Sequence, residues 1–99
     1  MDIRYSLSGV DFVWDAKKAS TNAAKHEGVT FEEAATVFFD PLFRVVDASQ
    51  NDEERDAVIG FSTRQRLLFV VHIQIKGTAI RIISARKATA QERRDYDNS

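Results

Sequence analysis

The 99-residue sequence contains no cysteine, one proline and four glycines. Without cysteine the chain forms no disulfide, offers zinc no thiolate ligand and carries no thiol nucleophile. The two histidines, His26 and His72, are isolated in the sequence, so we expect no metal site and no cofactor. A glycine-rich phosphate loop and a nucleophile elbow are also absent. The sequence therefore gives little support to a small-molecule enzyme.

Long apolar runs are missing as well. No run reaches the roughly 18 residues that a membrane span needs, and the first residues lack the basic-then-apolar order of a secretion signal. We therefore expect a cytoplasmic protein without membrane contact. Apolar residues make up 43% of the chain and include seven phenylalanines, which predicts a single domain over residues 1–99 with one core.

Charge is nearly balanced overall but uneven along the chain. The net charge is −1. Residues 1–60 carry six Lys/Arg against twelve Asp/Glu, whereas residues 61–99 carry eight against three. This asymmetry predicts a basic surface on the C-terminal half and an acidic surface elsewhere. A mixed surface with scattered ion pairs is the alternative.

Three helix starts can be recognised from their caps. Asp15 is a suitable N-cap for a helix that runs to about His26 and ends near Gly28. Capping boxes begin at Thr30, before a helix with a buried apolar stripe, and at Thr89, before a short C-terminal helix.

Strand patterns fill the region between the second and third helices. They cover residues 42–47, 56–62, 66–74 and 79–85. Connections this short require antiparallel neighbours. Residues 1–11 show no clear pattern, although 4–8 could form a short strand and 12–14 an edge strand. We therefore predict an α+β domain with two N-terminal helices, a four-stranded antiparallel sheet and a short C-terminal helix.

The last predicted strand carries charges inside an apolar run. Strict alternation would place Ile80, Ile82 and Ser84 on one face, and Arg81, Ile83 and Ala85 on the other. A charge such as Arg81 in this position is expected to be paired or to face a cleft. Arg86 and Lys87 follow at the strand end, and guanidinium groups are well shaped for phosphate.

The first predicted helix carries a polar stripe. Lys18, Asn22, Lys25 and His26 fall on one helix face. This stripe could contact an anionic ligand, or it could be an ordinary solvated surface.

Residues along most of the chain resemble the BrnT toxin family. The matching positions are Trp14-Asp15, Lys18, Asn22, Lys25-His26, 28–34, Phe38, Asp40-Pro41, Glu54-Arg55, Ile59-Gly60, 66–68, Val70-Val71, 80–86, Ala88-Thr89, Glu92-Arg93 and Tyr96. The resemblance implies a RelE-like fold and a ribonuclease of a type II toxin–antitoxin system, held inactive by a BrnA antitoxin. It further implies a heterotetramer with BrnA, which would carry the DNA-binding function, so that this chain meets DNA only indirectly. One departure is Glu27, which stands between Lys25-His26 and Gly28, where the family usually has Gly directly.

RNA cleavage without a metal needs a proton acceptor for the 2′-hydroxyl, cations for the phosphorane and an acid for the leaving oxygen. His26 is the acid–base candidate because imidazole titrates near neutral pH. Lys25 could act as a base only where its surroundings favour the neutral amine. Arg81 and Arg86 are the candidates for charge stabilisation. Glu54 is either a base or the ion-pair partner of an arginine.

Five further residues are candidates for RNA binding. They are Lys18, Asn22, Arg66, Lys87 and Tyr96. Tyr96 could stack on a base or donate a proton, or it could simply close the last helix over the sheet. His72 shares a strand face with Leu68 and Val70, which favours a partly buried structural role.

A different class of function also fits the sequence. A catalytically weak or inactive toxin-like module would bind its antitoxin and act as a transcriptional corepressor. Salt-sensitive RNA binding by the isolated chain would favour the enzyme, and its absence alongside tight antitoxin binding would favour the module.

Overall fold

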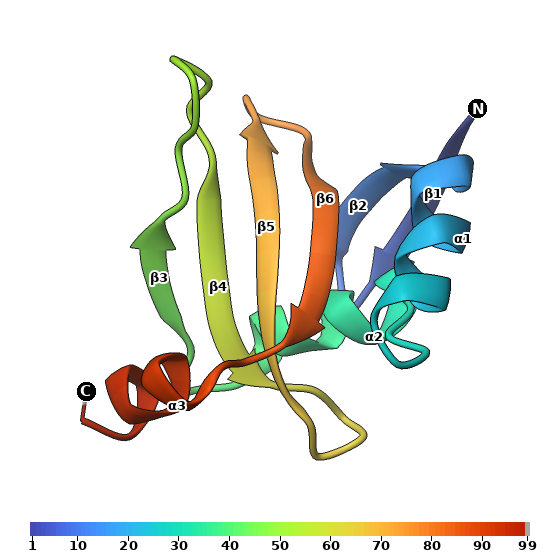
Figure 1. The fold of residues 1–99 in the computed structure, drawn as a ribbon. Helices are drawn as coiled ribbons and strands as arrows, with labels where there is room; N and C mark the ends of the chain where they lie inside the picture. Colours follow the sequence, from blue (N-terminus) through green and yellow to red (C-terminus); the bar gives the residue numbers. More distant parts are fainter. Residues whose placement is uncertain (99) are drawn as a thin grey trace.

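The computed structural model describes residues 1–98, which form a curved sheet flanked by helices (Figure 1). The strands are β1 (Asp2–Leu7), β2 (Val10–Asp15), β3 (Arg44–Asp47), β4 (Asp56–Phe61), β5 (Leu67–Ile75) and β6 (Ala79–Lys87). The helices are α1 (Ala16–Lys25), α2 (Phe31–Thr36), the 3-10 turn η1 (Val37–Phe39) and α3 (Ala90–Asp97). None of the helices described is long and apolar enough to cross a membrane.

The sheet has six strands in the order β1-β2-β6-β5-β4-β3. Neighbours are antiparallel except for β2 and β6, which pair in parallel through Phe12 with Ile80 and Val13 with Arg81. The prediction of a four-stranded antiparallel sheet preceded by two helices is therefore wrong. An N-terminal hairpin comes first and adds two strands, and its second strand makes the sheet mixed.

The hairpin has a local cause in the sequence. Ser8 and Gly9 both have positive φ, 49° and 82°, as a two-residue turn with the twist of a hairpin requires. Ile3, Tyr5 and Leu7 alternate with polar residues along β1, and this period of two is the signal that should have identified the strand.

The three helix caps are where the sequence places them. Backbone amides of the first turns donate to the side chains of Asp15 (3.0 Å), Thr30 (3.0 Å) and Thr89 (3.2 Å). Only the box at Thr89 is complete, since the Glu92 carboxylate also accepts from the Thr89 amide. Glu33 does not reach back to Thr30, because its carboxylate has other partners.

Alternation along the strands gives the sheet two different faces. The inner face is covered by α2 and η1 in the main core, which includes Phe31, Ala34, Ala35, Val37, Val58, Leu68, Val70 and Ile82. The open face is covered only at one end, where Tyr96 of α3 packs on Ile59 and Leu67. The rest of the open face lies between α1 and the long β3–β4 hairpin (Figure 1).

A β-bulge in β6 changes which side chains reach the open face. Val71 pairs with Ser84 and His72 with Ile82, so Ile83 is an extra residue without a partner. Ile82 and Ala85 consequently both lie in the main core. The strict alternation predicted for this strand is therefore wrong: Ser84 lies on the face of Arg81, and not on that of Ile82.

Candidate functional site

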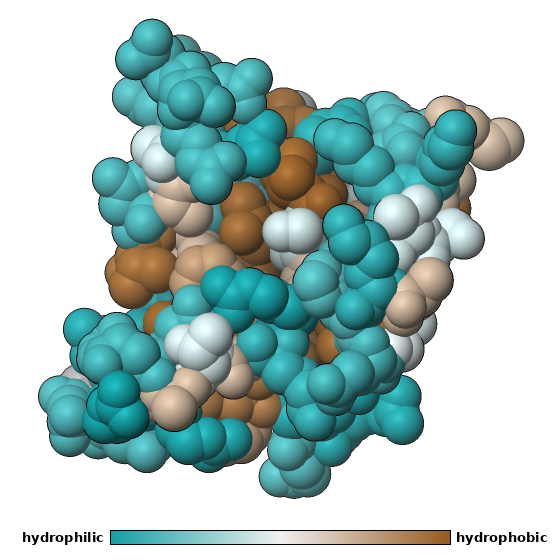
Figure 2. Space-filling model, in the orientation of Figure 1, coloured by the Kyte–Doolittle hydropathy of each residue, from teal (hydrophilic) through white to brown (hydrophobic). Residues whose placement is uncertain are grey.

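The open face contains a groove made of two adjoining hollows. One, of about 440 Å³, lies between α1 and β6 and is lined by residues that include Lys18, Lys25, His26, Ile83 and Ser84. The other, of about 420 Å³, lies between the sheet and the β3–β4 hairpin and is lined by residues that include Ser49, Arg55, Phe69, Ser84 and Arg86. Ser84 lines both hollows, so it joins them into one groove. Figure 2 shows this hollowed surface with apolar residues on its floor.

Asn22 fixes α1 against β6 and so determines where the groove wall stands. Its amide donates to the carbonyls of Ala85 (2.8 Å) and Val29 (3.1 Å), and its oxygen accepts from the Ala85 amide at 3.0 Å. Asn22 is 6% exposed. Because the amide is occupied by backbone groups, Asn22 positions Lys25 and His26, which lie three and four residues further along the helix.

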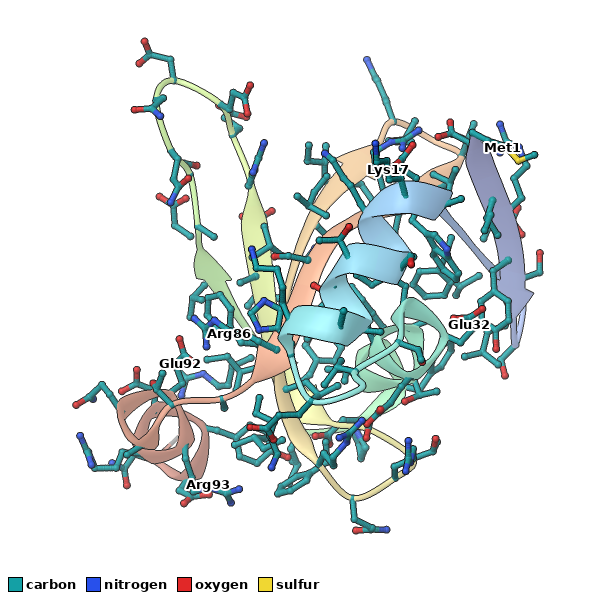
Figure 3. All side chains as sticks on the ribbon, turned by 45° about the vertical axis from the view of Figure 1, so that its right-hand side comes forward. Met1, Lys17, Glu32, Arg86, Glu92 and Arg93 are labelled. Carbon is teal, nitrogen blue, oxygen red and sulfur yellow. The ribbon has the colours of Figure 1, made fainter. Side chains whose placement is uncertain are left out.

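Arg86 is held at the floor of the groove by two contacts. Its guanidinium donates two hydrogen bonds to the Glu92 carboxylate, at 2.8 and 2.9 Å, and lies 4.3 Å from the centre of the Phe69 ring. Figure 3 shows Arg86 and Glu92 side by side where β6 leads into α3, with Arg93 further along the helix. Burial alone would raise the pKa of Glu92, but the hydrogen bonds from Arg86 and Thr89 outweigh it and lower that pKa. The pair therefore stays ionised, and Arg86 keeps one orientation.

Arg55 and Ser84 belong to the groove although the sequence did not identify them as site residues. Arg55 donates to Glu53 at 2.7 Å, while its Nε is buried and lacks a hydrogen-bond partner within residues 1–98. A buried donor of this kind is available to an anion. Ser84 reaches the groove only because of the bulge, which no local pattern announces. The proximity of Arg55 to Glu54 in the sequence was the available signal.

Arg81 is not brought to the groove. Its guanidinium reaches across β2 and pairs with Asp2 of β1 at 2.9 Å. It lies near Asp15 at the start of α1, and that carboxylate contributes to raising the pKa of Arg81 after the larger effect of the Asp2 hydrogen bond. His26 lies at the other end of this ten-residue helix, roughly 15 Å away along its axis. Arg81 and His26, both candidates for the same reaction, therefore do not lie together.

Arg66 and Lys87 are also engaged in ion pairs. Arg66 makes a two-pronged contact with the carboxylate of Glu33, which is 6% exposed and also accepts from Ser62 at 2.7 Å. Lys87 pairs with Glu27 at 2.9 Å on the surface. These pairs and Arg81–Asp2 join cations of the C-terminal half to carboxylates of the N-terminal half. The surface is thus mixed, as the alternative reading of the charge asymmetry anticipated.

Tyr96 and His72 have structural surroundings. The Tyr96 hydroxyl donates to Asp40 at 2.6 Å, and burial together with this carboxylate raises the pKa of Tyr96 to about 12. His72 is buried against the ring of Phe38, and burial lowers the pKa of His72. Tyr96 closes α3 over the sheet, which was the alternative to base stacking, and His72 is buried on the strand face where the sequence placed it.

Glu54 lies beside the groove. It lines a third hollow, of about 390 Å³, together with Arg55, Asp56 and His72.

Lys18 and Lys25 are exposed on the groove side of α1, and neither has an ion-pair partner among the residues described. Residues 1–98 contain no cluster of three or more His, Asp or Glu that could hold a metal ion.

Of the predicted residues, the groove brings together Lys18, Asn22, Lys25, His26 and Arg86, and it adds Arg55 and Ser84. A comparison with protein families gives one match over residues 14–92, to the family described as the ribonuclease toxin, BrnT, of type II toxin–antitoxin systems. No curated protein matches the chain.

Proposed function

Because this chain belongs to the BrnT family of ribonuclease toxins of type II toxin–antitoxin systems, we propose that it cleaves RNA in the groove on the open face of its sheet. The observation that carries the proposal is the shared position of Ser84, which makes the hollow of Lys25 and His26 continuous with that of Arg55 and Arg86. An acid–base group and several cations therefore face one groove, as phosphodiester chemistry requires.

The proposed reaction is internal transesterification without a metal ion. The 2′-oxygen attacks the adjacent phosphorus and loses its proton, the bond from phosphorus to the 5′-oxygen breaks, and that oxygen receives a proton. The products are a 2′,3′-cyclic phosphate and a 5′-hydroxyl. His26 exchanges the protons, while Arg86 and Lys25 stabilise the charge on the phosphorane. Phe69 packs beneath Arg86 and supports its guanidinium in the groove.

The partner proposed for this ribonuclease is a BrnA-type antitoxin, in a heterotetramer through which the chain would meet DNA only indirectly. Both partners would act in the cytoplasm, where RNA is translated.

The test is incubation of the purified chain with labelled RNA, free and on translating ribosomes, in excess chelator, followed by analysis of the new ends. We expect cyclic phosphate ends with wild type, and a loss of about 10²- to 10⁴-fold in rate with His26→Ala. Lys76→Ala, a cation in the β5–β6 turn, is the matched control and should cleave normally. A folded wild type that cleaves neither substrate would contradict the proposal and favour the corepressor module.

Two further variants test the roles of Arg86 and Arg81 separately. Arg86→Gln/Glu92→Gln removes the groove cation without leaving its partner carboxylate unpaired, and should lower the rate by about 10²- to 10³-fold. Arg81→Gln should cleave at nearly the wild-type rate, because Arg81 is paired with Asp2 outside the groove. Loss of cleavage with Arg81→Gln at unchanged stability would show that Arg81 takes part in the reaction.

A further inference from the structure

A second surface, away from the groove, carries exposed apolar side chains. Phe39, Leu42, Phe43 and Val45 are 42%, 67%, 42% and 53% exposed and follow one another through η1 and the start of the edge strand β3. We call these four residues the edge strip. Only Val45 of the four lies on β3 itself, and the others lead into it. Large exposed apolar side chains beside an open strand edge favour association with another chain.

The backbone of β3 has hydrogen-bonding groups to offer at this edge. The Ala48 amide donates to the Arg55 carbonyl at 2.9 Å, which sets the alternation of bonds between β3 and β4. In an antiparallel pair every second residue bonds to the neighbouring strand, so Val46 and Arg44, two and four residues before Ala48, bond to β4. The N–H and C=O groups of Val45 and Asp47 therefore point away from the sheet. Two residues at this spacing can accept an added strand.

The segment that follows the edge strip is strongly acidic. Residues 47–56, which we call the acidic arm, contain Asp47, Asp52, Glu53, Glu54 and Asp56 against the single cation Arg55. The arm is the hydrophilic projection at the upper left of Figure 2. A partner that runs along β3 towards this arm gains from basic residues.

We propose that an extended segment of the antitoxin adds to the outer edge of β3 as a seventh strand, with an aliphatic residue opposite Val45 and a Lys or Arg opposite Asp47. The inference rests on the proposed function for the identity of the partner, because a type II toxin requires an antitoxin. Main-chain bonds to Val45 and Asp47 supply affinity, and the side chains at alternate positions supply specificity.

A second copy of this chain fits the edge less well. Residues directly opposite one another in an antiparallel pair share a face, so a twofold pairing must be centred on a residue. When the twofold axis passes through Val45, Val46 or Asp47, Asp47 lies opposite Phe43, Val45 or Asp47 of the other copy, respectively. Each of these registers sets a carboxylate against an apolar side chain or a like charge.

The edge strip is separate from the groove. Val45 is opposite Val58, and Phe43 lies 3.3 Å from the position that a Cβ of Gly60 would occupy, so both belong to the inner-face side of the sheet. A strand added here would anchor the antitoxin without filling the groove. Substitutions in the strip should therefore change antitoxin affinity and leave RNA cleavage alone.

The test measures the affinity of the purified chain for its cognate antitoxin by titration calorimetry. Val45→Lys and Leu42→Lys should each weaken binding by about tenfold or more, because a charge replaces an apolar side chain of the edge strip, on β3 at Val45 and just before it at Leu42. Ile3→Lys is the matched control, since Ile3 is 38% exposed on β1 at the opposite edge of the sheet, and should bind within about twofold of wild type. Binding of both strip variants at wild-type affinity would overturn the proposal.

Amide exchange provides a readout that does not depend on the variants folding. In the complex, the amides of Val45 and Asp47 should become protected, while those of Arg44 and Val46 should change little. Uniform or absent protection would refute strand addition. RNA cleavage by the same preparations distinguishes the two proposals. A chain that shows this protection but does not cleave RNA would support the antitoxin site and contradict the ribonuclease proposal. A chain that cleaves RNA without this protection would support the ribonuclease and refute strand addition.

Discussion

Two arginines approach the same buried carboxylate, and the structure predicts very different costs for removing them. The guanidinium of Arg66 makes the two-pronged contact with Glu33 and is only 20% exposed, whereas Arg64 lies 4.0 Å from the same carboxylate and is 67% exposed. Arg66→Ala leaves a buried carboxylate without its main partner, which costs about 3 kcal/mol at the lower end of the range for such pairs. Arg64→Ala removes an exposed pair and should cost less than about 0.5 kcal/mol.

Thermal unfolding followed by circular dichroism measures both costs. For a domain of this size, 1 kcal/mol corresponds to a shift in Tm of about 4–8 °C. Arg66→Ala should therefore lower Tm by roughly 12–24 °C, and Arg64→Ala by less than about 4 °C. The double variant Glu33→Gln/Arg66→Ala should recover part of the loss, because it removes the buried charge together with its partner.

The dependence on pH supplies the critical check. The Arg66 hydrogen bond lowers the pKa of Glu33 below its ordinary value of 4.5. The stability that comes from this pair is therefore complete above about pH 4.5 and is lost as the pH falls through the folded-state pKa. The difference in Tm between wild type and Arg66→Ala should shrink in acid. Equal effects of the two arginine substitutions, or a difference independent of pH, would refute the reasoning.

Three other substitutions test separate parts of the structure. Tyr96→Phe removes the hydroxyl bond to Asp40 and should lower the free energy of unfolding in urea by about 1–2 kcal/mol; in wild type the phenol should titrate near 12 by ultraviolet absorbance, against an ordinary value of 10.0. Asn22→Ala removes three hydrogen bonds between α1 and its neighbours and should cost about 3 kcal/mol in the same urea assay, with a fall in RNA cleavage at temperatures where the variant is folded. Gly60→Ala would place a methyl group 2.9 Å from Val37 and should cost about 1–3 kcal/mol by urea unfolding. Destabilisation below 0.5 kcal/mol in any of the three, or a Tyr96 titration near its ordinary value, would contradict the corresponding contact.

Features that depend on neighbouring residues could be predicted from the sequence. The caps at Asp15, Thr30 and Thr89 involve side chains and amides only three residues apart, and all three are present. The strands after Pro41 were found because apolar alternation and short turns are local as well. Short strands at 4–8 and 12–14 were considered, but they were left out of the predicted sheet and not joined as a hairpin, although the alternation of Ile3, Tyr5 and Leu7 was visible.

Features that depend on distant residues could not be predicted. The parallel pairing of β2 with β6 joins segments separated by two helices and three strands, and no local pattern encodes it. The bulge at Ile83 lies in the pairing of β6 with β5, and no local pattern predicts it either. The same limit explains the candidate site: a free and a paired arginine look alike in a sequence, so Arg66 and Arg81 were assigned to RNA before their partners Glu33 and Asp2 were known.

The hydrogen bonds between Asn22 and Ala85 affect the order in which the groove forms during synthesis. These residues are 63 positions apart, and at translation rates of about 5–20 residues per second the later one is made on the order of 3 to 13 s after the earlier. Until β6 emerges, α1 lacks the hydrogen bonds between Asn22 and Ala85, and Lys25 and His26 have no Ser84 to face. A nascent chain therefore completes its groove only after β6 has been synthesised, so the surface proposed to bind RNA is among the last parts of this face to form.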